Sequence, residues 1–167
     1  YKGHVHKINK LKCRRMIPTF LKEFLDCETP TSWLNTLSSD DLGNCVGKEP
    51  WGFSHNPSQF VVLGGTGMFA CFQILLYLGF EEIVLLGVDH DFGEAGILAK
   101  KNKNVVSGSS AHKHFMPGYY RASEQVHIDV DSIERAFEVA YNEYLASGKR
   151  ILNASPGTKL NVVPRVE

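Results

Sequence analysis

Residues 59 to 88 constrain the fold most, because three apolar runs of different length follow one another there. The first run, QFVVL at 59–63, is short, β-branched and aromatic, and it predicts a buried strand. Residues 66–78 are apolar nearly all round and predict a helix that Gly79 ends. The third run, EEIVLLGV at 81–88, predicts a second buried strand of the kind found in parallel sheets. Strand, helix and strand make a βαβ crossover, which is right-handed by default.

A second helix and a third strand are predicted near the end of the sequence. Asp131 and Glu134 have the spacing of a capping box, and apolar residues recur after them at helical spacing until Gly148. KRILNAS, residues 149–155, predicts the strand. The polar segment 93–127 predicts a functional lid or a disordered loop. Together these elements predict a doubly wound α/β fold with a mostly parallel sheet.

The first 58 residues are weakly patterned and predict an irregular and helical portion of the same domain, with 59–167 as its Rossmann-like core. IPTFLKEFL predicts a short helix that begins after Pro18. A basic cluster near the start lacks the interleaved aromatic residues of single-strand binders, so we interpret it as solvated surface rather than a polyanion patch. Its members are Lys7, Lys10, Lys12, Arg14 and Arg15.

Composition limits the classes of function. Lys and Arg number 18 and so do Asp and Glu, and the resulting formal net charge of zero argues against general binding of nucleic acids or anionic membranes. The four cysteines form no CxxC pair, and we expect them to be reduced, with Cys71 acting as a small hydrophobe in its helix. The longest apolar stretch, 68–80, is interrupted by Gln73 and is too short to span a bilayer. We therefore expect a soluble, cytoplasmic protein without a transmembrane segment.

Polar groups follow each of the three predicted core strands. They are Gly64-Gly65-Thr66, Asp89-His90-Asp91 and the run from Asn153 to Gly157. In open α/β sheets ligands bind beyond the carboxyl ends of the strands. If the three strands are parallel and adjacent, these groups gather at one edge and predict an active site.

The glycine turn has two interpretations. Without β-carbons the backbone can approach a ligand closely, and the first amides of the following helix suit a phosphate or a carboxylate. However, GGTG is neither GxGxxG nor GxxxxGK[ST], and no lysine is placed to reach a phosphate. In the alternative interpretation, Gly64 and Gly65 only let helix and strand pack closely.

The aspartate after the second strand and the later polar loop supply the candidate chemistry. Asp89 can accept hydrogen bonds from ribose hydroxyls or base N–H groups, or hold a metal with Asp91; alternatively it caps the following turn. A single loop histidine suits proton transfer near neutrality, and a zinc site formed with His90 is the alternative. His112 and His114 are the loop candidates. Tyr119 and Tyr120 can donate hydrogen bonds to a leaving phosphate or anchor the loop by packing.

Several of these motifs resemble one bacterial and archaeal family. They are GGTGMFACFQILLYLGFEEIVLLGVDHDF, HFMPGYY and GKRILNASPGTKLNVVPRVE, and the similarity covers roughly residues 50 to 167. The family is that of the 6-hydroxymethylpterin diphosphokinase-like proteins. It includes the motility-accessory-factor glycosyltransferases and is similar in fold to the bacterial CMP-sialic-acid sialyltransferases.

This resemblance implies a GT-A-like, Rossmann-like transferase that binds a nucleotide. Its donor would be a CMP-activated nonulosonic acid of the sialic-acid type, its acceptor a surface glycan or a protein, and it would need no cofactor. Gly64, Gly65 and Thr66 would approach the nucleotide and Asp89 would fix its ribose or base. Asn153 and Ser155 would line the far wall. His114 would act as the acid–base residue and Tyr120 would steady the departing phosphate.

The resemblance also leaves two other functions open. One is diphosphate transfer from ATP to a pterin alcohol, with Asp89 and Asp91 holding Mg²⁺. The other is a non-catalytic remnant or binding module, because the family's upstream strand and glycine-proline-serine turn do not precede Tyr1. We accordingly expect the later part of a longer protein, or a fold without its N-terminal strands. A missing upstream domain or a second copy in a homo-oligomer would cover the aromatic side chains of residues 1 to 60.

Overall fold

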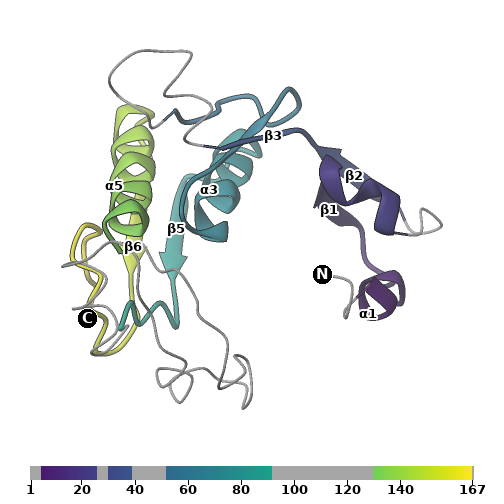
Figure 1. Cartoon of the computed structure of the whole chain (residues 1–167). Helices are drawn as coiled ribbons and strands as arrows, with labels where there is room; N and C mark the ends of the chain where they lie inside the picture. Colours follow the sequence, from purple (N-terminus) through teal and green to yellow (C-terminus); the bar gives the residue numbers. More distant parts are fainter. Residues whose placement is uncertain (1–4, 26–29, 39–51, 92–129, 167) are drawn as a thin grey trace. The chain divides into compact units, whose positions relative to one another are not determined.

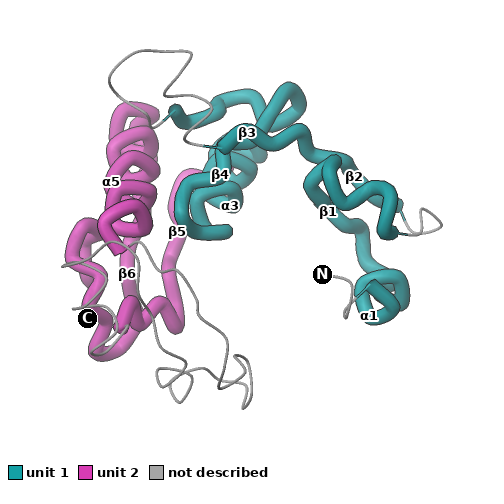
Figure 2. The backbone as a smooth tube through the Cα atoms, in the orientation of Figure 1, with its two compact units in different colours: residues 1–79 teal, residues 80–167 magenta. Residues whose placement is uncertain are grey.

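The computed structural model describes residues 5–25, 30–38, 52–91 and 130–166. These residues form helices, parallel strand pairs and loops (Figure 1). The chain divides into two compact units, residues 1–79 and residues 80–167 (Figure 2). Within these described ranges, the strands form three two-stranded sheets, β1–β2, β3–β4 and β5–β6, and all three are parallel. Among the described residues, no helix is long and apolar enough to cross a membrane.

The first unit begins with a helix and a strand pair that the sequence did not predict. Helix α1 spans Val5–Asn9, strand β1 Arg15–Pro18 and strand β2 Thr31–Leu34. Arg15 is buried because its guanidinium is used internally: Nε donates to Thr31 Oγ1 at 3.0 Å and Nη1 to the Ile8 carbonyl at 3.2 Å. The interpretation of the basic cluster as solvated surface is therefore wrong for Arg15. The other four members are exposed, and their interpretation as solvated surface stays a prediction.

The short helix predicted after Pro18 is confirmed as a 3₁₀ helix, η1, over Thr19–Phe24. Its aromatic residues do not form a buried face, because Phe20 is 53% and Phe24 39% exposed. Leu25, which follows the helix, is buried.

The rest of the first unit contains the predicted strand and helix around the glycine turn. Strand β3 spans Thr36–Ser38, strand β4 Val61–Leu63 and helix α3 Gly67–Tyr77. Leu37 in β3 pairs with Val62 in β4. Gly79 has a φ of 90°, as expected of a glycine that ends a helix. Cys71 is exposed, so the expectation that it packs as a small hydrophobe is wrong.

Gln73 explains why a polar residue interrupts the apolar helix α3. The side chain is fully buried, and its amide completes the hydrogen bonding of the β4 edge opposite to β3. Nε2 donates to the Val62 carbonyl, and Oε1 accepts from the Val62 N–H, both at 2.9 Å. The same amide also accepts from the Ser54 N–H at 3.0 Å and donates to the Phe69 carbonyl at 2.9 Å. One side chain thus satisfies backbone groups that would otherwise be buried without partners.

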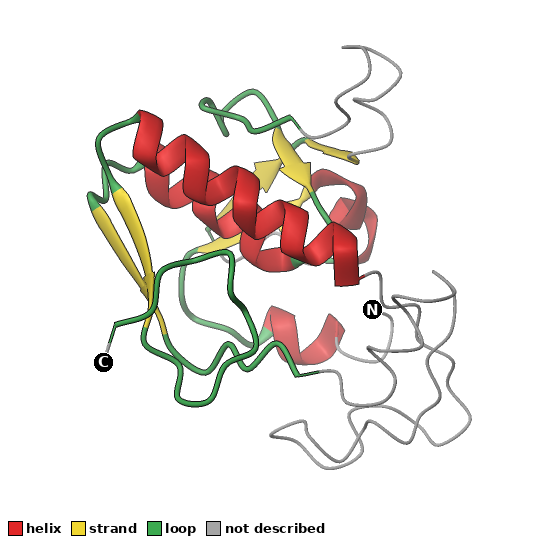
Figure 3. Cartoon of the chain, turned by 90° about the vertical axis from the view of Figure 1, so that its left-hand side faces the viewer, coloured by secondary structure: helices red, strands yellow, loops and turns green. Residues whose placement is uncertain are grey.

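The second unit holds strand β5 (Glu82–Leu85), helix α5 (Val130–Ala146) and strand β6 (Arg150–Asn153). The two strands pair in parallel, with Leu85 opposite Asn153, and α5 contacts β6 (Figure 3). The core of this unit is formed by apolar side chains of all three elements and of the segment after β6. Its largest buried members are Leu85, Phe137, Tyr144, Ile151 and Leu160.

The predicted capping box at the start of α5 is not formed. The helix begins at Val130, so Asp131 is its second residue rather than its cap. The Glu134 carboxylate lies 3.3 Å from His90 Nε2. Gly148, which has a φ of 69°, follows the helix as predicted.

These elements confirm the α/β class with parallel strand pairing. β4, α3, β5, α5 and β6 occur in the predicted order and at nearly the predicted positions. The described strands remain in three separate pairs, so the continuous, doubly wound Rossmann-like sheet stays a prediction.

Candidate functional site at the carboxyl ends of strands β5 and β6

Beyond the ends of β5 and β6, side chains make the hydrogen bonds that backbone groups make within the strand pair. The segment after β5, residues 88–91, is referred to here as the Asp89 segment. Val88 donates its N–H to Ser155 Oγ at 2.9 Å and accepts at its carbonyl from Thr158 Oγ1 at 2.7 Å. The Asp89 carbonyl accepts from the Lys159 N–H at 2.8 Å. The backbone of this segment is thus bound to the loop that follows β6.

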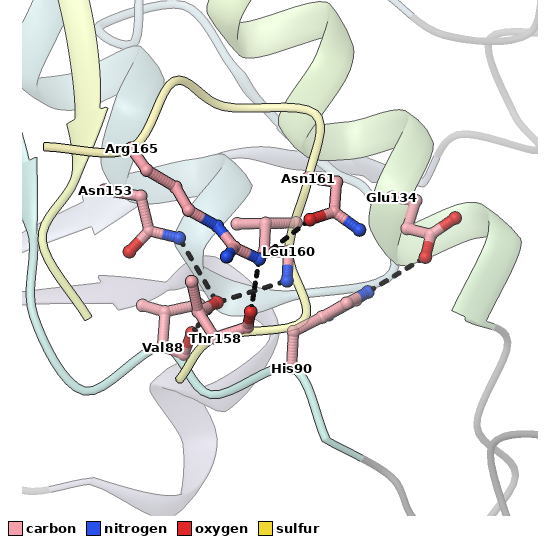
Figure 4. Close-up of polar contacts among 8 residues, drawn as sticks. All are labelled: Val88, His90, Glu134, Asn153, Thr158, Leu160, Asn161 and Arg165. Atoms are coloured by element: carbon pink, nitrogen blue, oxygen red, sulfur yellow. Dashed lines mark hydrogen bonds and ion pairs between the residues drawn. The ribbon is translucent and has the colours of Figure 1, made fainter. Parts of the chain in front are cut away.

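His90 fixes the same segment to helix α5. Its φ of 51° is in the left-handed region, which few residues other than glycine adopt. The ring is buried, and its Nε2 lies 3.3 Å from Glu134 Oε1 (Figure 4). It also meets the Phe137 ring edge-on at a centroid distance of 6.4 Å. The neighbouring Asp91 is bound through its side chain, because Lys159 Nζ lies 2.9 Å from Asp91 Oδ1.

The loop after β6 is itself held by two buried polar side chains. Asn153 Oδ1 accepts from the Ser155 N–H at 3.0 Å, and its Nδ2 donates to Thr158 Oγ1 at 3.3 Å. Thr158 Oγ1 also accepts from the Leu160 N–H at 3.1 Å. Arg165 closes the loop by donating from Nη2 to the Thr158 carbonyl and to Asn161 Oδ1 (Figure 4). Within the described ranges, no buried side-chain nitrogen or oxygen lacks a partner.

Three of the predicted site residues lie in the second unit, and they do not share one role: Asn153 and Ser155 bind other parts of the protein, whereas Asp89 is exposed. Asn153 and Ser155 were expected to line a ligand cleft, but the bonds above engage their polar atoms and both residues are buried. Asp89 is exposed, and its carboxylate makes no hydrogen bond or ion pair with any residue that the structure describes. Asp89 is thus the member of this group that can receive a ligand.

Sequence reasoning missed Thr158 as part of this arrangement. Its hydroxyl donates to Val88 and accepts from two further groups. The available signal was the neighbouring polar run from Asn153 to Gly157 at the end of a predicted strand, which was interpreted as ligand-binding. In the structure, this run instead bonds mainly to backbone groups of the protein.

The glycine turn lies in the first unit and begins helix α3. Gly65 has a φ of 59°, and Thr66 Oγ1 caps the helix by accepting from the Met68 N–H at 3.3 Å. Gly67 is exposed, and a β-carbon added there would meet nothing within 4 Å. These residues thus form the predicted turn between strand β4 and helix α3. Its expected meeting with Asp89 in one pocket stays a prediction, because the two residues belong to different units.

The remaining predicted residues cannot be compared with the structure. His112, His114, Tyr119 and Tyr120 lie outside the described residues. Within the described parts, no group of three or more His, Cys, Asp or Glu side chains could hold a metal ion. A shallow open hollow lies on η1 of the first unit, lined by Thr19, Phe20, Lys22 and Glu23, none of which was predicted to bind a ligand.

Comparison of the chain with protein-family models, curated proteins and solved structures finds no match.

Proposed function

We propose that this chain is a transferase domain that binds a CMP-activated nonulosonic acid and passes the sugar to a glycan or protein hydroxyl. The observation that carries the proposal is the exposed Asp89 carboxylate beyond the carboxyl end of β5, in a parallel strand pair. Parallel α/β sheets bind ligands at this end of their strands. A carboxylate there can accept hydrogen bonds from the two ribose hydroxyls of a nucleotide.

The start of helix α3 gives separate support. Thr66 caps the helix, and exposed Gly67 leaves open space beside the first helical amide. A helix N-terminus with this access suits the phosphate of CMP, because its amides and dipole favour an anion. We propose that Gly64, Gly65 and Thr66 approach the nucleotide there.

The proposed reaction is an in-line displacement at the anomeric carbon of the donor. The acceptor oxygen forms the new bond to that carbon while the bond to the phosphate oxygen breaks, so CMP leaves with the electron pair. His114 takes the proton of the acceptor hydroxyl, and Tyr120 donates a hydrogen bond to the departing phosphate. Asp89 holds the nucleotide. The roles of His114 and Tyr120 rest on the sequence alone.

The second candidate is diphosphate transfer from ATP with Mg²⁺ held by Asp89 and Asp91. Carboxylates are the ligands that Mg²⁺ takes, and these two follow the same strand. However, Asp91 Oδ1 is already 2.9 Å from Lys159 Nζ, so Mg²⁺ would have to share this carboxylate with an ammonium group that repels it. This contact favours the metal-independent transfer.

Calorimetric titration with CMP, CTP and ATP tests the proposal on three proteins: the unsubstituted chain, Asp89→Asn and Asp131→Asn. Asp131 is an exposed aspartate on α5 and serves as the matched control. We expect Asp89→Asn to weaken CMP binding roughly tenfold or more, since it removes a charge-assisted acceptor, and Asp131→Asn to leave it unchanged.

Each of the other possible outcomes favours a different interpretation of the function. Equal CMP affinity in all three proteins would contradict the role of Asp89. Binding of ATP but not CMP, abolished by EDTA and restored by Mg²⁺, would favour diphosphate transfer. Absence of binding to every nucleotide would favour a non-catalytic module.

A further inference from the structure

Val88 is bound at both of its backbone polar groups by side chains distant in sequence. Ser155 and Thr158, separated from it by 67 and 70 positions, hold its N–H and its carbonyl respectively. Strand β5 ends at Leu85 and β6 at Asn153, so these two hydroxyls continue the cross-strand bonding beyond the last ladder pair. Val88, the first residue of the Asp89 segment, is therefore fixed in place shortly after the end of strand β5.

The residues after Asp89 are also bound, but through their side chains. The ring of His90 lies against Glu134 and Phe137, and Asp91 pairs with Lys159. Asp89 itself contributes only its carbonyl, to the Lys159 N–H. The segment has three polar side chains, those of Asp89, His90 and Asp91. Among these, the Asp89 carboxylate has no partner within the described ranges.

We propose that Ser155 and Thr158 are positioning residues, which fix the Asp89 segment so that the Asp89 carboxylate is presented to the nucleotide before it binds. This inference rests on the proposed function of Asp89. Fixing the backbone beforehand removes the ordering cost that a flexible loop would incur on binding. The two hydroxyls thus act on the ligand through Asp89 and do not contact it.

Four variants separate this role from general support of the fold. Thr158→Val removes the hydroxyl at nearly constant shape, and Thr158→Ser retains it. Ser155→Ala removes the partner of the Val88 N–H and serves if Thr158→Val does not fold. The double variant Asp89→Asn with Thr158→Val shows whether the threonine acts through the aspartate, because groups that act independently have additive effects on binding.

Two measurements are made on each protein: calorimetric CMP affinity, and amide hydrogen exchange at Val88, Lys159 and Ala140. Ala140, buried on α5, reports general loosening of the second unit. We expect Thr158→Val to weaken CMP binding roughly tenfold and Thr158→Ser to stay within about twofold of the unsubstituted chain. In the Asp89→Asn background, we expect Thr158→Val to change the affinity by less than about twofold. Exchange should accelerate at Val88 and Lys159 but not at Ala140.

The outcomes distinguish this inference from the proposed function. If the unsubstituted chain binds no CMP, the proposed function fails. Faster exchange confined to Val88 and Lys159 in the Thr158→Val variant would still show that Thr158 fixes the Asp89 segment. If the chain binds CMP and Thr158→Val weakens binding equally with and without Asp89, the positioning role is overturned. Unchanged exchange at Val88 in both Ser155→Ala and Thr158→Val would also overturn it.

Discussion

Gln73 shows how much one residue can contribute to the first unit. Its amide makes four hydrogen bonds, three of them to backbone groups outside its own helix. The sequence marked this position only as a polar interruption of an apolar helix. Nothing in the local pattern identifies the partners, because Val62 and Ser54 approach the side chain only in the folded chain.

We predict that Gln73→Met destabilises the first unit by about 3 kcal/mol or more. Methionine has a similar length but leaves buried backbone groups unsatisfied, at about 1–3 kcal/mol for each. Gln59→Met makes the same change at an exposed position and is expected to stay within about 0.5 kcal/mol of the unsubstituted chain. Urea unfolding measures both, and equal stability of the two variants would contradict the role of Gln73.

Tyr144 makes the second unit sensitive to alkaline pH. Burial raises the pKa of its phenol from 10.0 to about 12. Between these values the unfolded chain has lost the phenol proton while the folded chain keeps it. The free energy of unfolding therefore falls as pH rises from about 10 to about 12, by roughly 2–3 kcal/mol, and this contribution is constant below pH 10.

Urea unfolding between pH 9 and pH ~11.5 checks this expectation, with Tyr144→Phe and Tyr77→Phe as the compared variants. Tyr77 is 54% exposed and supplies the matched control. We expect Tyr144→Phe to lose stability less steeply than the unsubstituted chain over this range, and Tyr77→Phe to follow the unsubstituted chain. Parallel curves for all three proteins would show that Tyr144 is not the responsible group.

At the scale of elements, the two glycines at the ends of α3 have opposite requirements. Gly67 begins the helix with open space around it, whereas Gly79 follows the helix with a φ of 90°. We predict that Gly67→Ala stabilises the chain by about 0.5 kcal/mol, because alanine lowers the backbone entropy of the unfolded state. Gly79→Ala is expected to destabilise it by about 1 kcal/mol, because a β-carbon is strained at positive φ.

Midpoints of urea unfolding give the sign of each change, and opposite signs are the expected result. The proposed function adds a second expectation for Gly67→Ala. If a phosphate approaches this turn closely, the stabilised variant should bind CMP more weakly. Destabilisation by Gly67→Ala would contradict the open environment described for this glycine.

The elements that the sequence predicted correctly are those with a local apolar signal. β4, β5 and β6 lie in apolar runs, and α5 has apolar residues at helical spacing, so these signals are visible in the sequence. The expectation that β5 is a buried strand is wrong for most of its length, because only Leu85 of its four residues is buried. Strands β1, β2 and β3 mix polar with apolar residues and bury only Arg15, so no apolar run marks them in the sequence. Their pairing is decided by contacts between distant segments.

The candidate site could be predicted only in part for the same reason. Asp89 was identified because a strand-end aspartate is visible from its neighbours in sequence. The internal use of Asn153 and Ser155 depends on Val88 and Thr158 meeting across the ends of two strands. A polar run after a strand looks the same whether its side chains bind a ligand or the protein itself.

At the scale of the whole molecule, the balance of charge leads to a prediction about polyanions. The formal net charge is zero, although Lys7, Lys10, Lys12 and Arg14 are exposed close together in sequence. We expect the chain to be retained weakly on heparin at low salt and to elute by about 0.15 M, where the Debye length is about 8 Å. Retention well above that salt concentration would show that these four residues form a specific polyanion site.

The amide of Gln73 has a consequence for self-association. An unpaired strand edge is a template on which a strand of another molecule can add, and such addition leads to aggregation. At Val62 the outward-facing N–H and carbonyl of β4 are already occupied from within the chain. Gln73 therefore leaves no free backbone group of Val62 to which a strand of another molecule could add.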